Sequence, residues 1–335
     1  MTGGNGQQRS VRAEHIVIAT GSAPIELPDL PFGGDIISST DALALTEVPD
    51  QLAVIGGGYI GLEIGTAFAK LGSTVTIIEA EDRILPQYDT ELTRPVSRRL
   101  KALGITVMTA ARARSLDDGR LTVETGSGVE TLATGKVLVT VGRRPRTRGS
   151  ELEELSLTFD GPFIEIDDRC QTSMRGVYAI GDVTGEPMLA HRAMAQGEMV
   201  AELLAGRNRS WDRVCIPAVC FTDPEIVTAG LSPDQAAASG RDIQTASFPF
   251  QANGRAMTIE RDDGFVRVVT RKDNALLLGI QAVGAGVSEL SATFALALEM
   301  GATLDDIAAT VHAHPTLSEG FHEACLRTLG HAIHI

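Results

Sequence analysis

One short segment, residues 52–79, restricts the possible folds of this chain more than any other. The apolar run 52–55 has the pattern of a buried strand, and a turn with the spacing Gly-x-Gly-x-x-Gly follows it over 56–61. The next stretch, 62–71, is helical in pattern, and 73–78 is apolar and β-branched like a second strand. Strand, turn, helix and strand in this order make a βαβ unit, which predicts a parallel sheet.

The glycines of this turn suit a dinucleotide. Gly56 permits the tight turn, Gly58 lets the backbone approach a pyrophosphate, and Gly61 lets the helix pack closely on the strand. The start of the helix then faces the phosphates, and Glu79, at the end of the second strand, can take the ribose hydroxyls. Glu79 would repel a 2′-phosphate, and no Arg cluster directly follows it, so we expect NAD rather than NADP. The alternative is a glycine-rich turn in an unrelated doubly wound sheet.

Composition narrows the choice of function. The chain has 335 residues with 29 Lys+Arg and 43 Asp+Glu, a net charge of −14, which argues against nucleic-acid or anionic-membrane partners. No apolar run approaches the roughly 20 residues that span a bilayer, and the polar start carries no secretory signal. Four cysteines make no disulfide framework, so we expect a cytoplasmic protein.

Other elements follow from the same patterns. Two apolar strands end in a Gly with a small or acidic polar residue, at 19–22 and 177–182, where α/β proteins bind ligands, although each is more often a plain strand end. The further predicted elements are a strand at 11–20, a Pro-rich linker at 23–32, a helix at 89–103, a strand at 105–108, a hairpin at 121–132, a strand at 136–141, a strand at 163–166, a helix at 191–204, mixed strands and short helices over 215–283, and one or two helices over 288–311.

Six motifs together resemble one enzyme family. They occur in the order seen in the flavin-dependent pyridine nucleotide-disulfide oxidoreductases, and the set is most similar to the dihydrolipoamide dehydrogenase branch. The C-terminal motif separates the chain from NADH oxidases, and the chain lacks the terminal cysteine pair of mercuric reductases. The motifs are ATGS (19–22), VIGGGYIGLEIG (54–65), VGRRP (141–145), VYAIGDV (177–183), MLAHRAMAQG (188–197) and HAHPTLSE (312–319).

The resemblance implies an α/β fold with doubly wound nucleotide-binding domains of the FAD/NAD(P) type, the FAD domain being incomplete, followed by an α+β dimerisation domain. The implied bounds are 1–35 and 149–210 for the FAD-binding parts, 36–148 for the NAD-binding domain and 211–335 for the dimer interface. It also implies a homodimer that oxidises dihydrolipoamide, bound to the lipoyl domains of 2-oxo acid dehydrogenase complexes. That reaction uses FAD and a Cys–Cys disulfide and reduces NAD.

The resemblance also assigns cofactor contacts. Those implied for NAD are Gly56, Gly57, Gly58, Tyr59, Ile60, Gly61, Leu62, Glu63 and Glu79, with Gly142 closing over the dinucleotide. Those implied for FAD are Gly21, Ser22, Asp182, Met188, Leu189, Ala190 and His191. No metal site is expected.

His314 and Glu319 are the catalytic pair that the match implies. Thiol–disulfide chemistry needs a base, because the thiolate is the nucleophile, and a carboxylate can orient an imidazole. Glu319 has an alternative reading, since Thr316-x-x-Glu319 is also a capping box for a helix over 317–329. The two roles for Glu319 are expected to need different side-chain directions. The neighbouring His312 is expected to be structural.

The cysteines do not supply the dithiol. Cys215 and Cys220 have the C-x4-C spacing, but their context matches the first strand of the interface domain, where positions five apart point to opposite faces. Cys170 and Cys325 are single and expected to be inert.

The chain also lacks the family's first FAD-binding Gly-x-Gly-x-x-Gly turn, and nothing before Val11 supplies it or the dithiol. We expect a fragment, an incorrectly assigned start or half of a split protein, without activity on its own. The alternatives are a non-catalytic NAD-binding and dimerisation module, or another disulfide reductase of this family.

Overall fold

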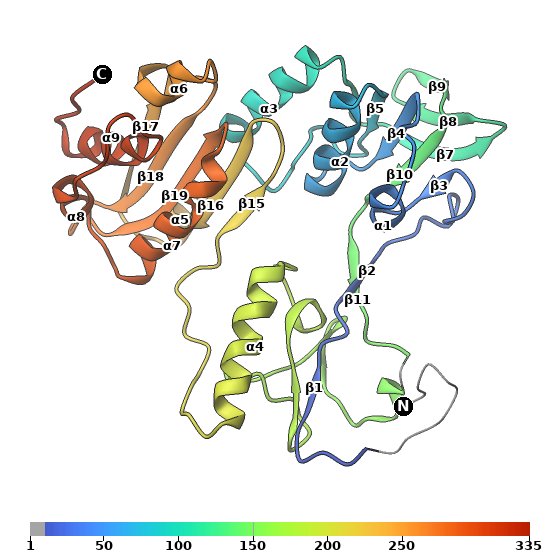
Figure 1. The fold of residues 1–335 in the computed structure, drawn as a ribbon, viewed down its shortest axis with the longest axis horizontal. Helices are drawn as coiled ribbons and strands as arrows, with labels where there is room; N and C mark the ends of the chain where they lie inside the picture. Colours follow the sequence, from blue (N-terminus) through green and yellow to red (C-terminus); the bar gives the residue numbers. More distant parts are fainter. Residues whose placement is uncertain (1–10, 150) are drawn as a thin grey trace. The chain divides into compact units, whose positions relative to one another are not determined.

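The computed structural model describes residues 11–149 and 151–335, which form two compact units (Figure 1). The first unit holds the described residues up to Ala23 together with Arg143–Asp212, and the second holds Pro24–Gly142 and Arg213–Ile335. Within the second unit we call residues 24–142 the βαβ domain and residues 213–335 the C-terminal domain. Among the described residues no helix is both long enough and apolar enough to cross a membrane.

The predicted βαβ unit is present at the centre of a five-stranded parallel sheet. Its strand order is β3 (Ile36–Ile37), β10 (Lys136–Val139), β4 (Gln51–Ile55), β5 (Thr74–Ile78) and β6 (Thr106–Met108). The helices of this domain are α1 (Ser39–Leu43), α2 (Tyr59–Lys70) and α3 (Thr90–Ala102). The predicted hairpin belongs to a three-stranded antiparallel sheet of β7 (Arg112–Asp117), β8 (Arg120–Thr125) and β9 (Gly128–Ala133).

The two faces of the parallel sheet are covered differently. Side chains alternate along β4, so that Leu52 and Val54 join the core beneath α2 and α3. Ala53 and Ile55 instead join the core that contains Leu121 of the antiparallel sheet. Because both faces are buried, the central strands are apolar without interruption. The expected α/β nucleotide-binding architecture is confirmed, with helices on one face and an antiparallel sheet on the other.

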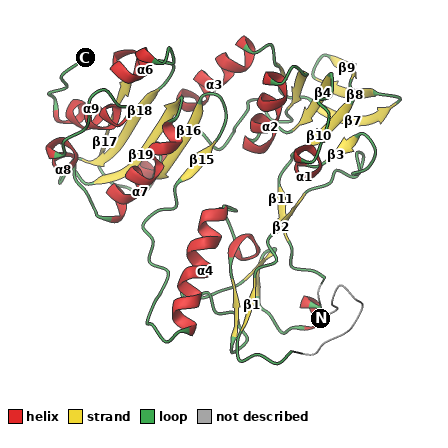
Figure 2. Cartoon of the chain, in the orientation of Figure 1, coloured by secondary structure: helices red, strands yellow, loops and turns green. Residues whose placement is uncertain are grey.

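The C-terminal domain is a five-stranded antiparallel sheet carrying helices (Figure 2). Its strand order is β15 (Ala218–Cys220), β16 (Glu225–Gly230), β19 (Leu277–Gly284), β18 (Phe265–Arg271) and β17 (Ile243–Pro249). The helices are α5 (Pro233–Ala238), α6 (Gly254–Thr258), α7 (Ser291–Glu299), α8 (Leu304–Ala309) and α9 (Ser318–Leu329). Helix α9 packs on β17 and β18, and α7 on β16 and β19. The α+β expectation for this domain is confirmed.

The first unit is built from short strands. Strands β1 (Ile16–Ile18) and β14 (Val177–Ala179) pair in parallel, and α4 (Ala190–Leu204) is the α-helix among the described residues of this unit. The remaining pairs are β2 (Ser22–Pro24) with β11 (Arg143–Pro145) and β12 (Phe159–Asp160) with β13 (Phe163–Ile164). The predicted strand at 11–20 is therefore only three residues long, and its Ile16 and Val17 are exposed.

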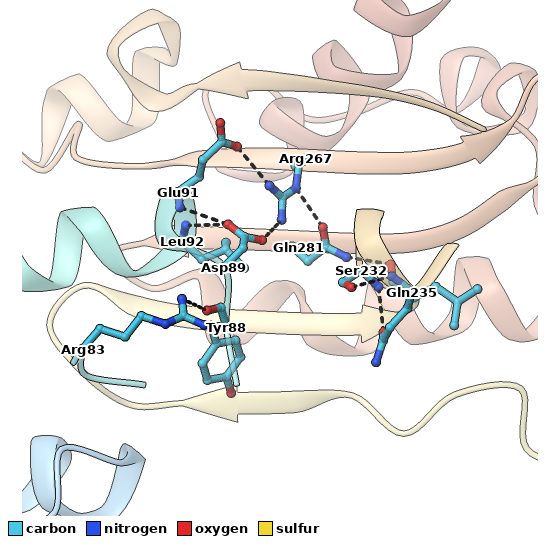
Figure 3. Close-up of polar contacts among 10 residues, drawn as sticks. Arg83, Tyr88, Asp89, Glu91, Leu92, Ser232, Gln235, Arg267 and Gln281 are labelled. Atoms are coloured by element: carbon cyan, nitrogen blue, oxygen red, sulfur yellow. Dashed lines mark hydrogen bonds and ion pairs between the residues drawn. The ribbon is translucent and has the colours of Figure 1, made fainter. Parts of the chain in front are cut away.

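A buried arginine joins the C-terminal domain to the start of α3 (Figure 3). Arg267 of β18 donates to the carboxylate of Asp89, to Glu91 at 3.0 Å and to Gln281 at 2.9 Å. Asp89 at the same time caps α3, because its other oxygen accepts the N–H groups of Glu91 and Leu92. The free energy lost on burying the Arg267 guanidinium is offset because two carboxylates and the Gln281 amide oxygen pair with it.

A second ionic cluster joins the same two domains. The carboxylate of Asp223 accepts from Lys70 Nζ at 2.8 Å, Arg99 Nε at 3.1 Å and Arg261 Nη2 at 2.5 Å. Burial alone would raise the pKa of Asp223, but the three cations outweigh it and lower the pKa to about 2. The Asp223 cluster therefore stabilises the second unit only while the carboxylate is ionised.

We predict that this unit loses stability in acid through Asp223. The pKa is about 2 in the folded protein against 3.8 ordinarily, so the contribution is complete above pH 4 and disappears as the pH falls through 2. Its size is roughly 2 kcal/mol. Asp223→Asn should lower the free energy of unfolding at pH 6 and flatten its fall between pH 4 and pH 2, as measured by urea denaturation. The matched control is Asp262→Asn, at an exposed neighbour. Equal acid sensitivity of Asp223→Asn and the unmodified chain would contradict the prediction.

Candidate functional site

The glycine turn after β4 leaves no room for side chains at two positions. A Cβ on Gly61 would lie 2.2 Å from the carbonyl oxygen of Gly56, and one on Gly56 would lie 2.6 Å from that of Thr140. Gly56 also has a φ of +105°, a conformation that glycine adopts without strain. A Cβ on Gly58 would meet nothing within 4 Å, so the space in front of this residue is open.

The start of α2 faces that open space. Gly58 is the N-cap, and no side chain of the described residues caps this end of the helix. The first N–H groups of a helix lack partners within the helix, and its dipole favours negative charge there. Open space and uncapped N–H groups are what a pyrophosphate requires, so the turn fits a dinucleotide.

The predicted acid stands beside the same turn. Glu79 follows β5 and is 8% exposed. One carboxylate oxygen accepts the Gly57 N–H at 2.6 Å, and the other accepts the Glu81 N–H at 2.7 Å. The nearest following cation, Arg83, donates to the carbonyl groups of Pro86 and Tyr88. A carboxylate therefore lies at the edge of the turn, and the next guanidinium along the chain donates to other groups.

The other residues expected to contact NAD are spread around α2. Tyr59 and Ile60 lie half-buried in its first turn. Leu62 is fully buried in the core, and the carboxylate of Glu63 accepts the N–H of Phe221 from the C-terminal domain at 2.8 Å. Burial raises the pKa of Glu63, which this hydrogen bond partly offsets. Direct cofactor contacts of all four residues stay predictions. The side chains of Leu62 and Glu63 have other partners within the protein.

Gly142 lies at the end of the same domain. It has a φ of +127°, and its carbonyl accepts the N–H of Ile25 at 3.0 Å. Its expected closure over the dinucleotide stays a prediction.

In the first unit the two predicted strand ends meet. β1 and β14 run parallel with Ile18 beside Ala179, so their carboxyl ends lie together. Ser22 donates its hydroxyl to Asp182 at 2.5 Å, and Arg143 Nε donates to the Ser22 hydroxyl at 2.8 Å. Gly21, which precedes Ser22, has a φ of +69°. The residues expected to contact FAD from these two strands are therefore neighbours, and Arg143 is an addition that the motif VGRRP contains but that we did not single out.

The stretch expected along the flavin leads into α4. Met188 and Leu189 precede this helix, and Ala190 and His191 begin it. Arg192 is a buried residue that sequence reasoning missed. It donates to the Gly185 carbonyl at 2.6 Å and to the Thr184 hydroxyl at 3.1 Å, and burial lowers its pKa. An arginine within a helical motif gives no sign that it is buried, so only the structure identifies it.

The predicted catalytic pair is formed. His314 Nδ1 and Glu319 Oε1 are 2.9 Å apart, and the other oxygen of Glu319 accepts the Thr316 N–H at 2.7 Å. The alternative capping box is not formed, because the N-cap of α9 is Leu317 and the Thr316 hydroxyl donates to the Ala313 carbonyl. Glu319 nevertheless contacts both His314 and the Thr316 N–H from one side-chain direction, one with each oxygen.

The contacts of Glu319 determine its protonation state. Burial would raise the pKa of Glu319, but the Thr316 N–H, His314 and the charge of His334 lower it below its usual range. Glu319 is thus an anion that accepts from His314 Nδ1–H, which leaves Nε2 as the proton acceptor. The His314 ring is 71% exposed. Next to it, a pocket of about 490 Å³ is lined by Pro315, Thr316 and residues of α6 and the 285–290 segment.

His312 has a packing environment. Its ring stacks on that of His322 with centroids 4.9 Å apart, and its Nδ1 lies 3.2 Å from the Ser318 hydroxyl. Burial and His322 lower the pKa of His312. These contacts agree with the structural role expected for it.

All four cysteines are free thiols. Burial raises the pKa of Cys170 to about 11 and that of Cys220 to about 12, and it also raises the pKa of Cys215 and Cys325. Such thiols hold little thiolate at neutral pH, so none is a reactive nucleophile. Within 11–149 and 151–335 no group of three or more His, Cys, Asp or Glu side chains could hold a metal ion.

Family comparisons agree with this geometry. Residues 2–197 match the pyridine nucleotide-disulphide oxidoreductase family, and residues 216–325 match the dimerisation domain of the same family. Over 99% of the chain and 72% of the relative, the chain is 58% identical to a dihydrolipoyl dehydrogenase of Pseudomonas aeruginosa. It is 48% identical to one of Halobacterium salinarum over the same shares of chain and relative.

Solved structures give the same result. LpdA of Mycobacterium tuberculosis matches with a TM-score of 0.89 at 29% identity, over 97% of this chain and 72% of that one. An HOCl-induced flavoprotein disulfide reductase of Escherichia coli matches with a TM-score of 0.86 at 27% identity, over 94% of this chain and 74% of that one. Enzymes of this family use FAD and NAD(H). The chain belongs to the pyridine nucleotide-disulphide oxidoreductase family, a family of oxidoreductases.

Proposed function

We propose that this chain carries the NAD site, the catalytic base and part of the FAD site of a dihydrolipoyl dehydrogenase. The observation that supports this most directly is that one unit holds both an uncapped Gly-x-Gly-x-x-Gly turn and a His314–Glu319 pair at 2.9 Å. The substrate would be dihydrolipoamide on the lipoyl domains of 2-oxo acid dehydrogenase complexes. The relatives' names support that substrate.

His314 is the residue that handles the proton. Glu319 accepts Nδ1–H and stabilises the charged imidazolium, so Nε2 can take the proton of a dihydrolipoamide thiol. The resulting thiolate is the attacking species in disulfide exchange. The exposure of the ring suits a substrate arriving on another protein domain. FAD, when bound, supplies electron transfer between the thiols and NAD.

The residues present fit both cofactors in part. The open space before Gly58 and the uncapped N–H groups of α2 suit the NAD pyrophosphate, and Glu79 suits the adenosine ribose. For FAD, Asp182 would bind the ribityl chain, with Gly21 and Ser22 on the pyrophosphate side and residues 188–191 along the flavin.

We propose a homodimer in the cytoplasm. The match to a dimerisation domain supports dimerisation, as do the large exposed apolar side chains of the C-terminal domain, Leu296, Met300 and Val311. In such a dimer His314 would serve the flavin site of the other subunit. Light scattering at micromolar concentration tests this assembly.

A second candidate function is a nucleotide-binding and dimerisation module without catalysis. Three of the four thiols are buried and that of Cys215 is half-buried, and each has a raised pKa, which favours this function for residues 1–335 taken alone. The two functions can be distinguished by supplying the missing redox dithiol. An enzyme would then reduce NAD with dihydrolipoamide, whereas a non-catalytic module would not.

We predict that residues 1–335 alone do not reduce NAD with dihydrolipoamide, even with added FAD. A chimera should have this activity if it joins this chain to the N-terminal part of the Pseudomonas aeruginosa relative, of which the chain matches 72%. The readout is NADH absorbance. Turnover by residues 1–335 alone would contradict the prediction, and an inactive but folded, flavin-loaded chimera would favour the non-catalytic module.

In that chimera, His314→Gln should lower kcat by about 10²- to 10⁴-fold, the range that a positioned acid–base group supplies. Glu319→Gln should lower it less, since the imidazole remains while its orienting charge is lost. The matched control is His312→Gln, which alters a stacked neighbour outside the pair. Similar losses for His312→Gln and His314→Gln would show that the assignment of the base is incorrect.

For the dinucleotide, we predict that the unmodified chain binds NADH more tightly than NADPH, because Glu79 repels a 2′-phosphate. Glu79→Gln keeps an acceptor for the Gly57 N–H and removes the charge, so NADPH affinity should rise and NADH affinity should fall. Fluorescence titration measures both, with Glu81→Gln as the exposed control. Tighter binding of NADPH than of NADH by the unmodified chain would show the interpretation of Glu79 to be wrong.

A further inference from the structure

A second His–Glu pair lies on the same helix as the first. Glu323 of α9 is 3% exposed, and its carboxylate oxygens accept from His334 Nδ1 at 2.6 Å and from the Ile333 N–H at 3.1 Å. A carboxylate buried without such partners would be strongly unfavourable. The segment 331–335 therefore satisfies a buried charge that the mechanism above does not use.

The helix places the two pairs next to each other. Glu319 and Glu323 are four residues apart on α9, so their side chains project from the same face, and like charges at this spacing repel. Each carboxylate pairs with an imidazole that comes from a different end of the helix. His314 comes from the segment before α9, and His334 comes from the segment after it.

The charges around Glu319 are mixed. His334 is one of the groups that lower the pKa of Glu319, whereas burial, the largest single influence, raises it. Several titratable and charged groups lie on the elements around the pair. They are His312 and His314 before the helix, His322, Glu323 and Arg327 on it, His331 and His334 after it, Asp305 and Asp306 on the adjoining α8, and Arg255 and Glu289 lining the adjoining pocket. Of these groups, His334 both contacts Glu323 and lowers the pKa of Glu319.

We infer that Glu323 and His334 are positioning residues for the His314–Glu319 pair, an inference that rests on the proposed function. His334 balances the buried charge of Glu323 and holds the chain's last residues against α9. Because His334 pairs with Glu323, the carboxylate one turn away from Glu319 is balanced, and the oxygens of Glu319 remain on His314 and the Thr316 N–H.

The test replaces charge while keeping hydrogen bonding. His334→Gln retains a donor for Glu323 but cannot be protonated. The pKa of Glu319 should rise in this variant, as followed by ¹³C NMR of Glu-labelled residues 1–335, with Glu319→Gln identifying the resonance. The matched control is His331→Gln, an exposed histidine three residues earlier in the same segment, which should leave the titration unchanged.

Kinetics in the chimera give a second readout. His334→Gln should lower kcat by about 3- to 10-fold, a small part of what a positioned base supplies, and should change KM for dihydrolipoamide less than twofold. Glu323→Gln guards against a folding artefact, because its amide still accepts a hydrogen bond from His334 and no charge is left buried. It should lower kcat as well, though less than His334→Gln, because the ionic contact that holds His334 on α9 is weakened.

An unchanged titration of Glu319 in folded His334→Gln would overturn the inference, as would a kcat equal to that of His331→Gln. The failure of the proposed function would look different. In that case His314→Gln itself would leave kcat unaffected, whatever the titration of Glu319 shows.

Discussion

The close approach of α2 to β4 is the contact on which the nucleotide site depends. Gly61 lies so near the Gly56 carbonyl that a Cβ would come within 2.2 Å of it. This contact sets the direction of α2, and with it the position of the uncapped N–H groups at the start of the helix. Glu79 completes the arrangement, since it receives the Gly57 N–H from the turn itself. A larger residue at position 61 would displace the helix end, the phosphate site and the acid together.

The βαβ domain and the C-terminal domain are joined by ionised side chains as well as by apolar packing. Arg267 donates hydrogen bonds to residues at the N-terminus of α3. Asp223 forms ion pairs with one cationic side chain each from α2, α3 and the segment after α6. The apolar core beneath α3 continues into the C-terminal domain through Cys220, Ile226 and Val283. The nucleotide turn and the His314–Glu319 pair therefore belong to one compact unit.

Sequence reasoning succeeded where a local pattern fixes the outcome. The turn at 56–61 and the acid at 79 follow from the pattern of the βαβ unit, and both are found in the structure. The pair at 314 and 319 followed from the family resemblance, and its contact is also found. Ser22 and Asp182 were each assigned to FAD, but their hydrogen bond to each other was not predicted. The antiparallel sheet β7–β9 was only partly predicted. The hairpin at 121–132 covers β8 and β9, whereas polar residues dominate β7 and conceal its strand.

Other features depend on long-range contacts that no local pattern encodes. The Asp223 cluster unites residues more than 100 positions apart, and the burial of Arg192 depends on the loop it holds. The spacing of Thr316 and Glu319 does not show that one oxygen of Glu319 contacts His314 while the other accepts the Thr316 N–H. The Glu323–His334 pair was not predicted because no local motif links a helical glutamate to a histidine eleven residues later.

A crystal structure of residues 1–335 with NAD bound is the most direct test of the nucleotide site. We expect the pyrophosphate against the N–H groups at Gly58 and Tyr59, and both adenosine ribose hydroxyls within hydrogen-bonding distance of the Glu79 carboxylate. A dinucleotide bound elsewhere on the chain would contradict this assignment, as would an adenosine ribose turned away from Glu79.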